Sequence, residues 1–494
     1  MRFAEKKERY SYIIFALFSF AFCYLYTQAS PFHFYNASPD PNAYFSMGKG
    51  WVNGYIPYRD TFDQKGPVLY IVYAIGYLLS NDNFYGMYVI QSIFLLISMI
   101  IAYKLSRIFV SPACAFSLSV IYPALLGVLS FAGGTAEDLV STFQIAGLYL
   151  FVRYFRSGNQ SNVRDSFMQG ILIGFVFLIK FNLILFWFFP LMAIFIVLAC
   201  ERKYRLLLKH LGACCFGFIL VLVPFACYFL LVKGFSDFID CYFIFNFKYA
   251  AGNTVPVSFL LGNFKNYIKY HWLIFTVMCS GVLYFTFFSK QISSNILYRL
   301  SILLSFASVV CMVIPSMHSY YYIALNVFSF FGLLAIATFA EKYFAKRSLK
   351  YVAMPLSVVV GLLLGYTMKR NLFQYDKTER RQQLSLLIDE IKKEKGATVL
   401  NLGLSGYVET YNGINPTFKY FFYPNVDPDI MPDIRATQNE YIKNKEPMFI
   451  FISTSSPFCK KYYDHYEPLH KNYILVKKVM DKLECNEYFL YKRL

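Results

Sequence analysis

The chain has 494 residues, of which 57% are hydrophobic and 15% are charged. A soluble globular domain carries about 25% charged residues, so this composition excludes a soluble enzyme, a nucleic-acid-binding protein and a disordered chain. Lys and Arg together number 47 against 29 Asp and Glu, an excess that in a membrane protein more often reflects topology than contact with nucleic acid.

The first long apolar run, residues 10–26, follows the basic side chains Lys6, Lys7 and Arg9. A spanning helix needs about 20 apolar residues, so we expect an uncleaved first helix; a signal peptide is the alternative. Further apolar runs predict helices near 84–106, 110–131, 138–154, 166–180, 182–200, 208–232, 270–288, 296–315, 319–340 and 351–367. The sequence therefore predicts an α-helical polytopic membrane domain over residues 1–368, with about eleven transmembrane helices.

Whether the short apolar run 66–80 spans the membrane decides the orientation of every later helix. If it lies along the outer surface as a juxtamembrane helix, most Lys and Arg residues of 1–368 fall on the side of the N-terminus. Because cytoplasmic loops are enriched in Lys and Arg, we expect this arrangement in a bacterial inner (plasma) membrane. The N-terminus is then cytoplasmic and the C-terminus periplasmic or extracellular. Most loop acids lie at the outer face, either as a working surface or as ordinary solvated charge.

Residues 369–494 are richer in charge and lack long apolar runs. An amphipathic helix is predicted at 380–395. Short apolar segments predict strands at 397–404, 448–453, 473–479 and 487–491. We expect a small extracytoplasmic α/β domain, in which Cys459 and Cys485 either pair or stay separate. The chain has 11 cysteines and no CxxC pair, so no zinc site or disulfide-rich scaffold is implied.

The predicted first outer loop, within residues 31–83, carries a dense set of charged side chains next to the juxtamembrane helix. From Ser38 to Leu69 it reads S-P-D-P-N-A-Y-F-S-M-G-K-G-W-V-N-G-Y-I-P-Y-R-D-T-F-D-Q-K-G-P-V-L. A loop of this length is usually functional or disordered, and its Trp and Tyr content argues against disorder. Its charged side chains are therefore candidates for a functional site.

The pattern G-K-G-x-x-x-G-x-x-P-Y-R-D-x-x-D-x-K-G-P, with an Asp just past the first helix, resembles a known loop. It is similar to the first periplasmic loop of bacterial type C (GT-C fold) glycosyltransferases. These are related to protein O-mannosyltransferases and lipid A aminoarabinose transferases, and are glycosyltransferase 39-like. Weaker similarities to outer-face motifs of this family occur in G-G-T-A-E-D (133–138), F-N-F-K-Y (245–249) and H-S-Y-Y-Y (318–322).

The resemblance implies an enzyme that transfers a hexosyl or pentosyl group from a polyprenyl-phosphate-linked donor. The acceptor would be an extracytoplasmic glycolipid, polysaccharide or protein. Asp40 occupies the family's base position, where a carboxylate takes the acceptor's proton. A fixed cation must stabilise the leaving phosphate; the candidates are Lys65, which matches the family's K-G-P position, Arg59 and Lys180. Further active-site candidates are Asp60, Asp63, Glu137 and His318.

One departure from the family pattern bears on the acceptor. Protein O-mannosyltransferases carry Asp-Glu at the first motif, whereas here Asp40 precedes Pro41. The expected base is kept and its acidic neighbour is missing, which puts a protein acceptor in doubt. The same Asp-Pro pair is also suited to a helix cap or a turn.

The other candidates have structural alternatives as well. Arg59 and Asp60 could pair with each other on the surface, and Lys65 could reach the phosphates of ordinary lipids. Glu137 lies at a predicted helix start, where the helix dipole alone favours a carboxylate, and Asp138 is expected to do no more than this. A lone histidine such as His318 at a helix end is more often structural than catalytic.

Two other kinds of membrane protein compete with a glycosyltransferase. A secondary transporter would place charged residues near the bilayer midplane and show symmetry between its halves, and neither pattern is visible. An O-antigen polymerase or ligase-type protein is expected to depend on outer-loop arginines, and the predicted outer loops contain only Arg59. The expected partners are a polyprenyl-phosphate sugar, membrane lipids and an extracytoplasmic acceptor, without nucleic acid.

The sequence leaves the use of a metal ion, the identity of the sugar and the identity of the acceptor open. Asp40 together with Asp60, Asp63 or Glu137 could chelate a divalent ion such as Mg or Mn, but no spacing in the sequence demands one.

Overall fold

The computed structural model describes residues 2–31, 36, 39–81, 83–129, 133–157, 162–252, 256–314, 319–343, 347–372, 378–403, 414–422, 432–454, 462–481 and 486–494. His318, Cys459 and Cys485, which the sequence singles out, lie outside these residues.

The described chain packs into two compact units, each built from segments that are far apart in the sequence. Unit 1 contains Met1–Thr27, Tyr88–Phe225 and Val255–Arg370, and unit 2 contains Gln28–Met87, Ala226–Thr254 and Asn371–Leu494. The predicted division at residue 368 lies close to the start of the last segment of unit 2. Two earlier segments, one of which holds the predicted first outer loop, pack into this same unit.

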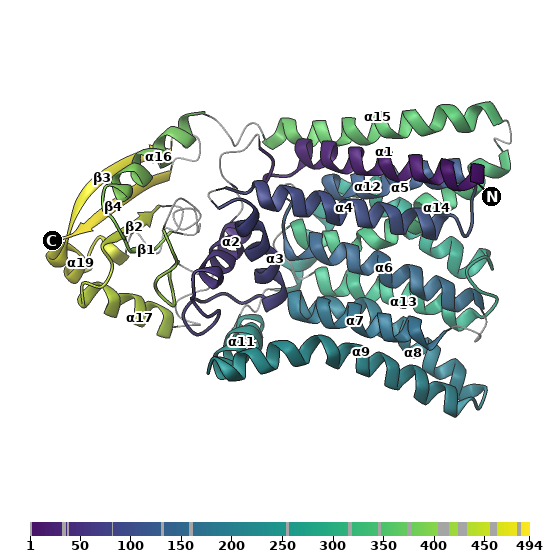
Figure 1. The fold of residues 1–494 in the computed structure, drawn as a ribbon, viewed down its shortest axis with the longest axis horizontal. Helices are drawn as coiled ribbons and strands as arrows, with labels where there is room; N and C mark the ends of the chain where they lie inside the picture. Colours follow the sequence, from purple (N-terminus) through teal and green to yellow (C-terminus); the bar gives the residue numbers. More distant parts are fainter. Residues whose placement is uncertain are drawn as a thin grey trace. The chain divides into compact units, whose positions relative to one another are not determined.

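Each predicted spanning run coincides with a long helix, and Figure 1 shows these helices running alongside one another in unit 1. They are α1 (Arg2–Tyr26), α4 (Tyr85–Ser106), α5 (Pro112–Leu129), α6 (Ala136–Ser157), α7 (Val163–Lys180), α8 (Leu185–Cys200), α9 (Tyr204–Leu231), α12 (Val257–Leu283), α13 (Ile296–Val313), α14 (Asn326–Tyr343) and α15 (Arg347–Leu372). Short non-α turns, η1 (Phe181–Ile184), η3 (Tyr284–Phe288) and η4 (Ser319–Leu325), extend or separate them.

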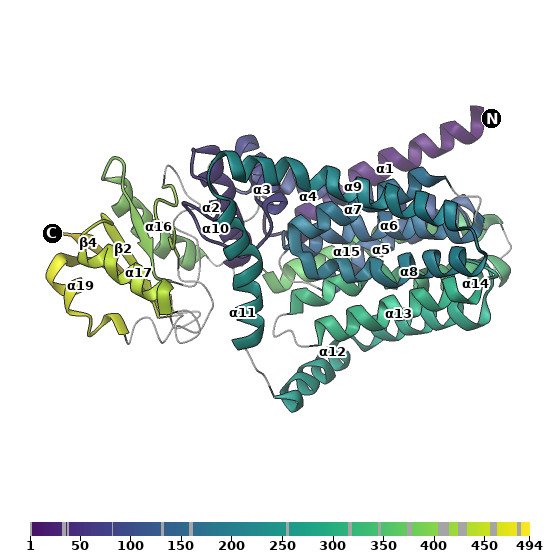
Figure 2. The ribbon, with the colours of Figure 1, turned by 90° about the horizontal axis from the view of Figure 1, so that it is seen from below.

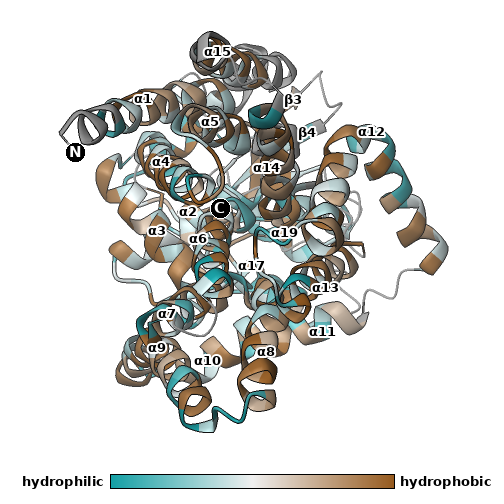
Figure 3. Ribbon diagram, turned by 90° about the vertical axis from the view of Figure 1, so that its right-hand side faces the viewer, coloured by the Kyte–Doolittle hydropathy of each residue, from teal (hydrophilic) through white to brown (hydrophobic). Residues whose placement is uncertain are grey.

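Within the described residues, 7 helical segments are long and apolar enough to cross a membrane. They are Glu8–Tyr26, Tyr85–Ser106, Val163–Cys200, Tyr204–Leu231, Val257–Phe288, Ile296–Val313 and Tyr320–Lys342. Large apolar side chains such as Phe216 and Leu273 are exposed on these helices, and Figure 3 shows the hydrophobic residues along them. The chain is therefore a multi-pass membrane protein, and the total of about eleven spans stays a prediction.

The disputed run 66–80 forms α3 (Pro67–Leu79), a helix of 13 residues. At 1.5 Å per residue it is roughly 20 Å long, shorter than the hydrocarbon core of about 30 Å. Its length leaves the juxtamembrane prediction standing. The preceding stretch, predicted as a loop, contains a further helix, α2 (Pro39–Val52), whose residues from Pro41 to Gly50 are all buried.

The C-terminal part of unit 2 is the predicted small α/β fold. Its elements are α16 (Thr378–Lys392), β1 (Val399–Asn401), α17 (Pro432–Lys443), β2 (Phe449–Ser453), α19 (Glu467–Asn472), β3 (Tyr473–Asp481) and β4 (Asn486–Arg493). The four strands, all predicted, form one sheet in the order β1-β2-β4-β3, with β1 and β2 parallel and the other pairs antiparallel.

Helices lie against both faces of this sheet (Figure 2), because the side chains of each strand point alternately to the two faces. Leu490 belongs to the same apolar cluster as Leu387 and Ile391 of α16, whereas the next residue, Tyr491, makes a ring contact with His470 of α19. The predicted amphipathic helix therefore covers one face, and α19 contacts the other.

A close approach between α2 and α3 is made possible by Gly48. A Cβ atom at this position would lie 2.5 Å from the backbone nitrogen of Ala74 and 2.8 Å from the carbonyl carbon of Tyr73. Both neighbours are backbone atoms of α3, which cannot move aside as a flexible side chain could. The first glycine of the G-K-G motif thus serves helix packing.

We expect Gly48→Ala to destabilise the protein by about 1–3 kcal/mol, as overpacking in a tightly packed core does. Thermal unfolding of the detergent-solubilised protein measures this. Gly212→Ala in α9 is the matched control, because a Cβ atom there meets nothing within 4 Å; helix propensity alone would stabilise it by up to about 1 kcal/mol. An equal loss in both variants would contradict the packing role of Gly48.

Candidate functional site

A buried hydrogen-bond network holds Asp63 and Lys65 of the first-loop motif within unit 2. The hydroxyl of Tyr70, on α3, donates to Asp63 Oδ2 at 2.9 Å and accepts from the backbone N–H of Lys65 at 3.0 Å. The Gln64 N–H donates to Asp63 Oδ1 at 2.8 Å. Burial raises the pKa of the Asp63 carboxyl, and the Lys65 ammonium acts in the opposite direction. The Asp63 carboxylate is thus enclosed in a hydrogen-bond network that also holds the backbone of Lys65.

Tyr58 supports the same network from the P-Y-R-D part of the motif. It is completely buried, and its hydroxyl donates to the carbonyl oxygen of Lys65 at 2.7 Å. Its φ angle of 71° is in the left-handed region, which costs a bulky residue energy and persists only where surrounding contacts enforce it. The loop between Tyr58 and Lys65 is therefore held in one conformation at both ends.

Asp40 lies in the first turn of α2 and is partly exposed. The hydroxyl of Tyr44, one turn further along, donates to Asp40 Oδ2 at 3.0 Å. Asp40 is also near enough to Asp63 for its negative charge to add to the rise in the pKa of Asp63. The predicted base and the Asp63–Lys65 network therefore belong to one neighbourhood of unit 2.

Arg59 and Asp60 form an ion pair with each other. Arg59 Nε donates to Asp60 Oδ1 at 2.8 Å and a second guanidinium N–H donates to Oδ2 at 2.9 Å. This pairing lowers the pKa of Asp60. Arg59 also donates to the carbonyl oxygen of Val232 at 2.9 Å. The surface pairing that the sequence left open is present, and phosphate binding by Arg59 stays a prediction.

The later motif F-N-F-K-Y, in α11 (Phe245–Gly252), contacts the first-loop motif. The side-chain amide of Asn246 donates to the carbonyl oxygen of Gln64 at 2.8 Å, and the rings of Phe62 and Phe245 lie 4.9 Å apart. Gln64 is the residue between Asp63 and Lys65. This motif therefore braces the site from a second segment of unit 2.

The C-terminal segment braces the first loop as well. The Phe62 N–H donates to the carbonyl oxygen of Lys419 at 2.7 Å, and the Lys419 ammonium pairs with Asp237 Oδ1 at 2.6 Å. Asp237 belongs to α10 (Phe235–Ile239), which precedes η2 (Asp240–Ile244). All three segments of unit 2 thus meet around the charged motif.

We expect Tyr70→Phe to destabilise the protein by about 1–3 kcal/mol, because it leaves Asp63 and the Lys65 N–H without a buried partner at that position. The unfolding temperature of the solubilised protein measures the loss. Tyr77→Phe on the same helix is the control, since the Tyr77 hydroxyl makes a contact of 3.4 Å, with Asn53, in an exposed setting. Equal unfolding temperatures for both variants would contradict a supporting role of Tyr70.

Two other candidates, Glu137 and Lys180, meet within unit 1. The Lys180 ammonium, at the end of α7, lies 2.5 Å from Glu137 Oε1, in the first turn of α6. The side chain of Glu137 is 1% exposed and that of Lys180 is 11% exposed. The ammonium also lies 3.7 Å from the ring centroid of Tyr321, a cation–π arrangement. The motifs at 133–138 and 318–322 therefore share one buried ion pair.

Asp138 has the structural role that was expected of it. Its Oδ2 accepts from both the N–H and the hydroxyl of Thr135, each at 3.0 Å, and Thr135 Oγ1 accepts from the Asp138 N–H at 3.3 Å. This reciprocal pattern is a capping box at the start of α6.

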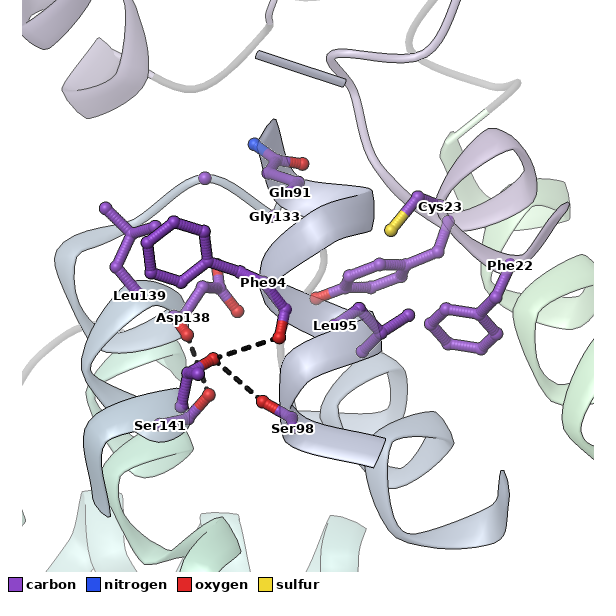
Figure 4. A pocket seen from close by; sticks show the side chains of 13 residues that line it. Phe22, Cys23, Gln91, Phe94, Leu95, Ser98, Gly133, Asp138, Leu139 and Ser141 are labelled. Atoms are coloured by element: carbon purple, nitrogen blue, oxygen red, sulfur yellow. Dashed lines mark hydrogen bonds between the residues drawn. The ribbon is translucent and has the colours of Figure 1, made fainter. Parts of the chain in front are cut away.

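A small cavity lies beside this helix start, between α1, α4 and α6 (Figure 4). Its volume is about 50 Å³, and apolar side chains such as Phe22, Phe94 and Leu95 line it. Ser98 and Thr142 also line it, and their hydroxyl groups are hydrogen-bonded to each other at 2.8 Å. A space of this size holds a few water molecules and is too small for a sugar.

The described residues contain no group of three His, Cys, Asp or Glu side chains arranged to hold a metal ion. Asp40 and Asp63 supply two carboxylates, and Asp63 already accepts from Tyr70 and Gln64. Metal binding therefore stays a prediction, and no step of the chemistry is assigned to an ion.

Several side chains in these networks were not predicted from the sequence. Tyr58 and Tyr70 hold the first-loop motif, Tyr321 lies over Lys180, and Asp237 pairs with Lys419. The partners of Tyr321 and Asp237 come from distant segments of the chain, whereas Tyr58 and Tyr70 contact residues seven positions away. The motifs P-Y-R-D and H-S-Y-Y-Y, which contain Tyr58 and Tyr321, were the available sequence signals.

Solved structures resemble this chain over most of its length. ArnT from Cupriavidus metallidurans bound to undecaprenyl phosphate matches with a TM-score of 0.65 at 11% identity, over 97% of each chain. The archaeal oligosaccharyltransferase AglB from Archaeoglobus fulgidus, in complex with an inhibitory peptide and a dolichol-phosphate, matches with a TM-score of 0.54 at 14% identity. That match covers 94% of this chain and 71% of AglB. ArnT is a lipid A aminoarabinose transferase, and both are GT-C fold glycosyltransferases.

No curated protein sequence matches the chain. These structural similarities establish the fold that the resemblance implied, a GT-C-like helical membrane protein with a small C-terminal sheet. A family model matches residues 3–376. The chain thus belongs to the Competence-induced Ccs4 N-terminal domain family.

Proposed function

We propose that this protein is a membrane glycosyltransferase that uses a polyprenyl-phosphate-linked sugar. The observation that carries the proposal is the neighbourhood of Asp40, Asp63 and Lys65 in a chain with the GT-C fold. The partly exposed carboxylate of Asp40 and the ammonium of Lys65, which both act on Asp63, are the two charges that glycosyl transfer from a phosphate requires. The lipid phosphate in the ArnT structure supports the choice of donor.

In the proposed reaction, Asp40 takes the proton of the acceptor hydroxyl or amine. The acceptor atom forms a bond to the anomeric carbon of the sugar, and the bond from that carbon to the donor phosphate breaks. The electron pair of the broken bond stays on the phosphate, whose added negative charge Lys65 stabilises. Asp63, Tyr70 and Tyr58 hold the backbone around Lys65 and do not exchange protons with the substrate.

The proposed placement of this site is the outer face of a bacterial plasma membrane, with a cytoplasmic N-terminus. The predicted distribution of Lys and Arg supports that orientation. The Asp40–Pro41 pair, in place of Asp-Glu, favours a glycolipid or polysaccharide acceptor over a protein.

A transfer assay with the purified full-length protein tests the function. Polyprenyl-phosphate sugars are supplied one at a time with a mixture of cell-envelope glycolipids, and release of free polyprenyl phosphate is measured. We expect release from at least one donor, dependent on added acceptor. Absence of release from every donor, together with uptake of a sugar into vesicles containing the protein, would favour a transporter instead.

We expect Lys65→Ala to raise the KM for the donor by roughly ten- to a hundredfold, since a charge-assisted contact contributes about 1.5–3 kcal/mol. The KM for the acceptor should stay the same, because the proposed partner of Lys65 is the donor phosphate. Lys393→Ala, at an exposed site in the C-terminal part, is the control. Unchanged donor kinetics in Lys65→Ala would assign the phosphate site to other residues.

A further inference from the structure

The N-terminal half of α12 differs from the other long helices of unit 1. The whole of α12, together with η3, forms an apolar segment of 32 residues, Val257–Phe288. At 1.5 Å per residue such a segment is roughly 48 Å long, well beyond the hydrocarbon core of about 30 Å. Part of it therefore has to lie outside the core of a membrane.

A kink at His271 separates the two parts. Its φ of −119° and ψ of 24° are not helical, and the exposed side chains of Tyr270 and Trp272 flank it. Tyr and Trp are enriched at the boundary between lipid and water. Residues 272–288, roughly 26 Å long at 1.5 Å per residue, are at the lower limit of about 17 residues for a spanning helix. We call residues 257–270, before the kink, the α12 arm; Figure 2 shows its free end apart from the neighbouring helices of unit 1.

The α12 arm has one side that faces the protein and another that is exposed. Tyr267 is buried and stacks on Tyr322 with ring centroids 3.5 Å apart, which fixes the side that faces the protein. Val257, Leu261, Lys265 and Lys269 follow one another at intervals of four residues and so form one row along the helix. Val257 is 69% and Leu261 is 56% exposed, and both lysines are exposed as well. One continuous exposed row is thus apolar at one end and basic at the other.

The charge of this row is not balanced by acids nearby in the sequence. The chain has no Asp or Glu between Asp240 and Glu341, whereas Lys248, Lys265 and Lys269 all lie in that stretch. Amphipathic helices with exposed apolar side chains beside lysines lie in the membrane interface, and the lysines attract anionic lipids. The positive charge of this stretch favours an anionic partner.

We propose that the α12 arm is a lipid-binding surface that lies in the membrane interface, where Lys265 and Lys269 bind the phosphate groups of anionic lipids. Val257 and Leu261 insert among the lipid chains, and the stacked Tyr267 ties the arm to the helix bundle. This inference concerns ordinary membrane lipids and does not depend on the proposed transfer reaction.

The test uses the full-length protein in a neutral detergent, titrated at low salt with phosphatidylglycerol or phosphatidylcholine and observed by native mass spectrometry. In the double variant Lys265→Gln, Lys269→Gln, the affinity for phosphatidylglycerol should fall roughly 25-fold, about fivefold for each lysine that contacts the lipid surface. The affinity for phosphatidylcholine should not change. Added salt should reduce the difference between the wild type and the variant.

The control double variant Lys443→Gln, Lys471→Gln removes the same charge from exposed positions in the C-terminal part and should bind phosphatidylglycerol as the wild type does. Lys265→Arg with Lys269→Arg should retain binding, which separates charge from folding. An unchanged affinity in the Lys265→Gln, Lys269→Gln variant would overturn the proposal. So would an equal loss in the control, which would indicate attraction by the net charge of the whole protein.

Discussion

Asp40→Asn should abolish sugar transfer while the protein stays folded. The amide has the shape of the carboxylate and still accepts the hydrogen bond from Tyr44, seen at 3.0 Å, but it cannot take the proton of the acceptor. Loss of a general base costs on the order of a hundred- to ten-thousandfold in rate. Initial rates of polyprenyl phosphate release at saturating donor measure the effect, and an unchanged unfolding temperature shows that the fold is kept.

Asp433→Asn is the matched control for this prediction. Asp433 also follows a proline in the first turn of its helix, α17, and lies in the same unit as Asp40. It is exposed and remote from the first-loop motif in sequence. If Asp40 serves only as a helix-start residue, the two variants should behave alike. Near-wild-type turnover in Asp40→Asn would remove Asp40 from the mechanism.

Lys180→Met should strongly destabilise the protein, because it leaves the Glu137 carboxylate buried without its cation. Removing one partner of a buried ion pair costs roughly 3–5 kcal/mol. The double variant Glu137→Gln, Lys180→Met should recover most of this loss, since no buried charge remains. Unfolding of the solubilised wild type, the single variants and the double variant gives the interaction free energy of the pair.

The surface pair Glu201–Lys203 is the control for this cycle. Its side chains are 39% and 48% exposed, so Lys203→Met should change stability by less than about 1 kcal/mol. The activity of the stable Glu137, Lys180 double variant then tests the predicted phosphate contact of Lys180. Full transfer activity there would mean that the ion pair is structural, and an inactive but stable protein would mean that Lys180 also serves the donor.

The helices of this protein could be located from the sequence because each is defined by its own residues. Apolar runs such as 84–106 and 296–315 coincide with α4 and α13, since a chain in lipid has to satisfy its backbone hydrogen bonds locally. The same holds for the strands of the C-terminal sheet, whose apolar segments are short and bounded by polar residues. The helix α2 was missed because its buried face includes Asn42, Ser46 and Lys49, which do not form an apolar pattern.

The sequence alone determined the membrane class, the positions of the long helices and strands, and the charged first-loop motif with its resemblance to GT-C enzymes. Only the tertiary structure decided how the charges are grouped. Lys180 pairs with Glu137, 43 positions earlier in the chain, and Lys419 pairs with Asp237, 182 positions earlier. Charge–charge contacts depend on separation in space, and residues far apart in the sequence approach only after helices have packed. For the same reason Asn246 and Lys419 emerge as supports of the first-loop motif only in the folded chain.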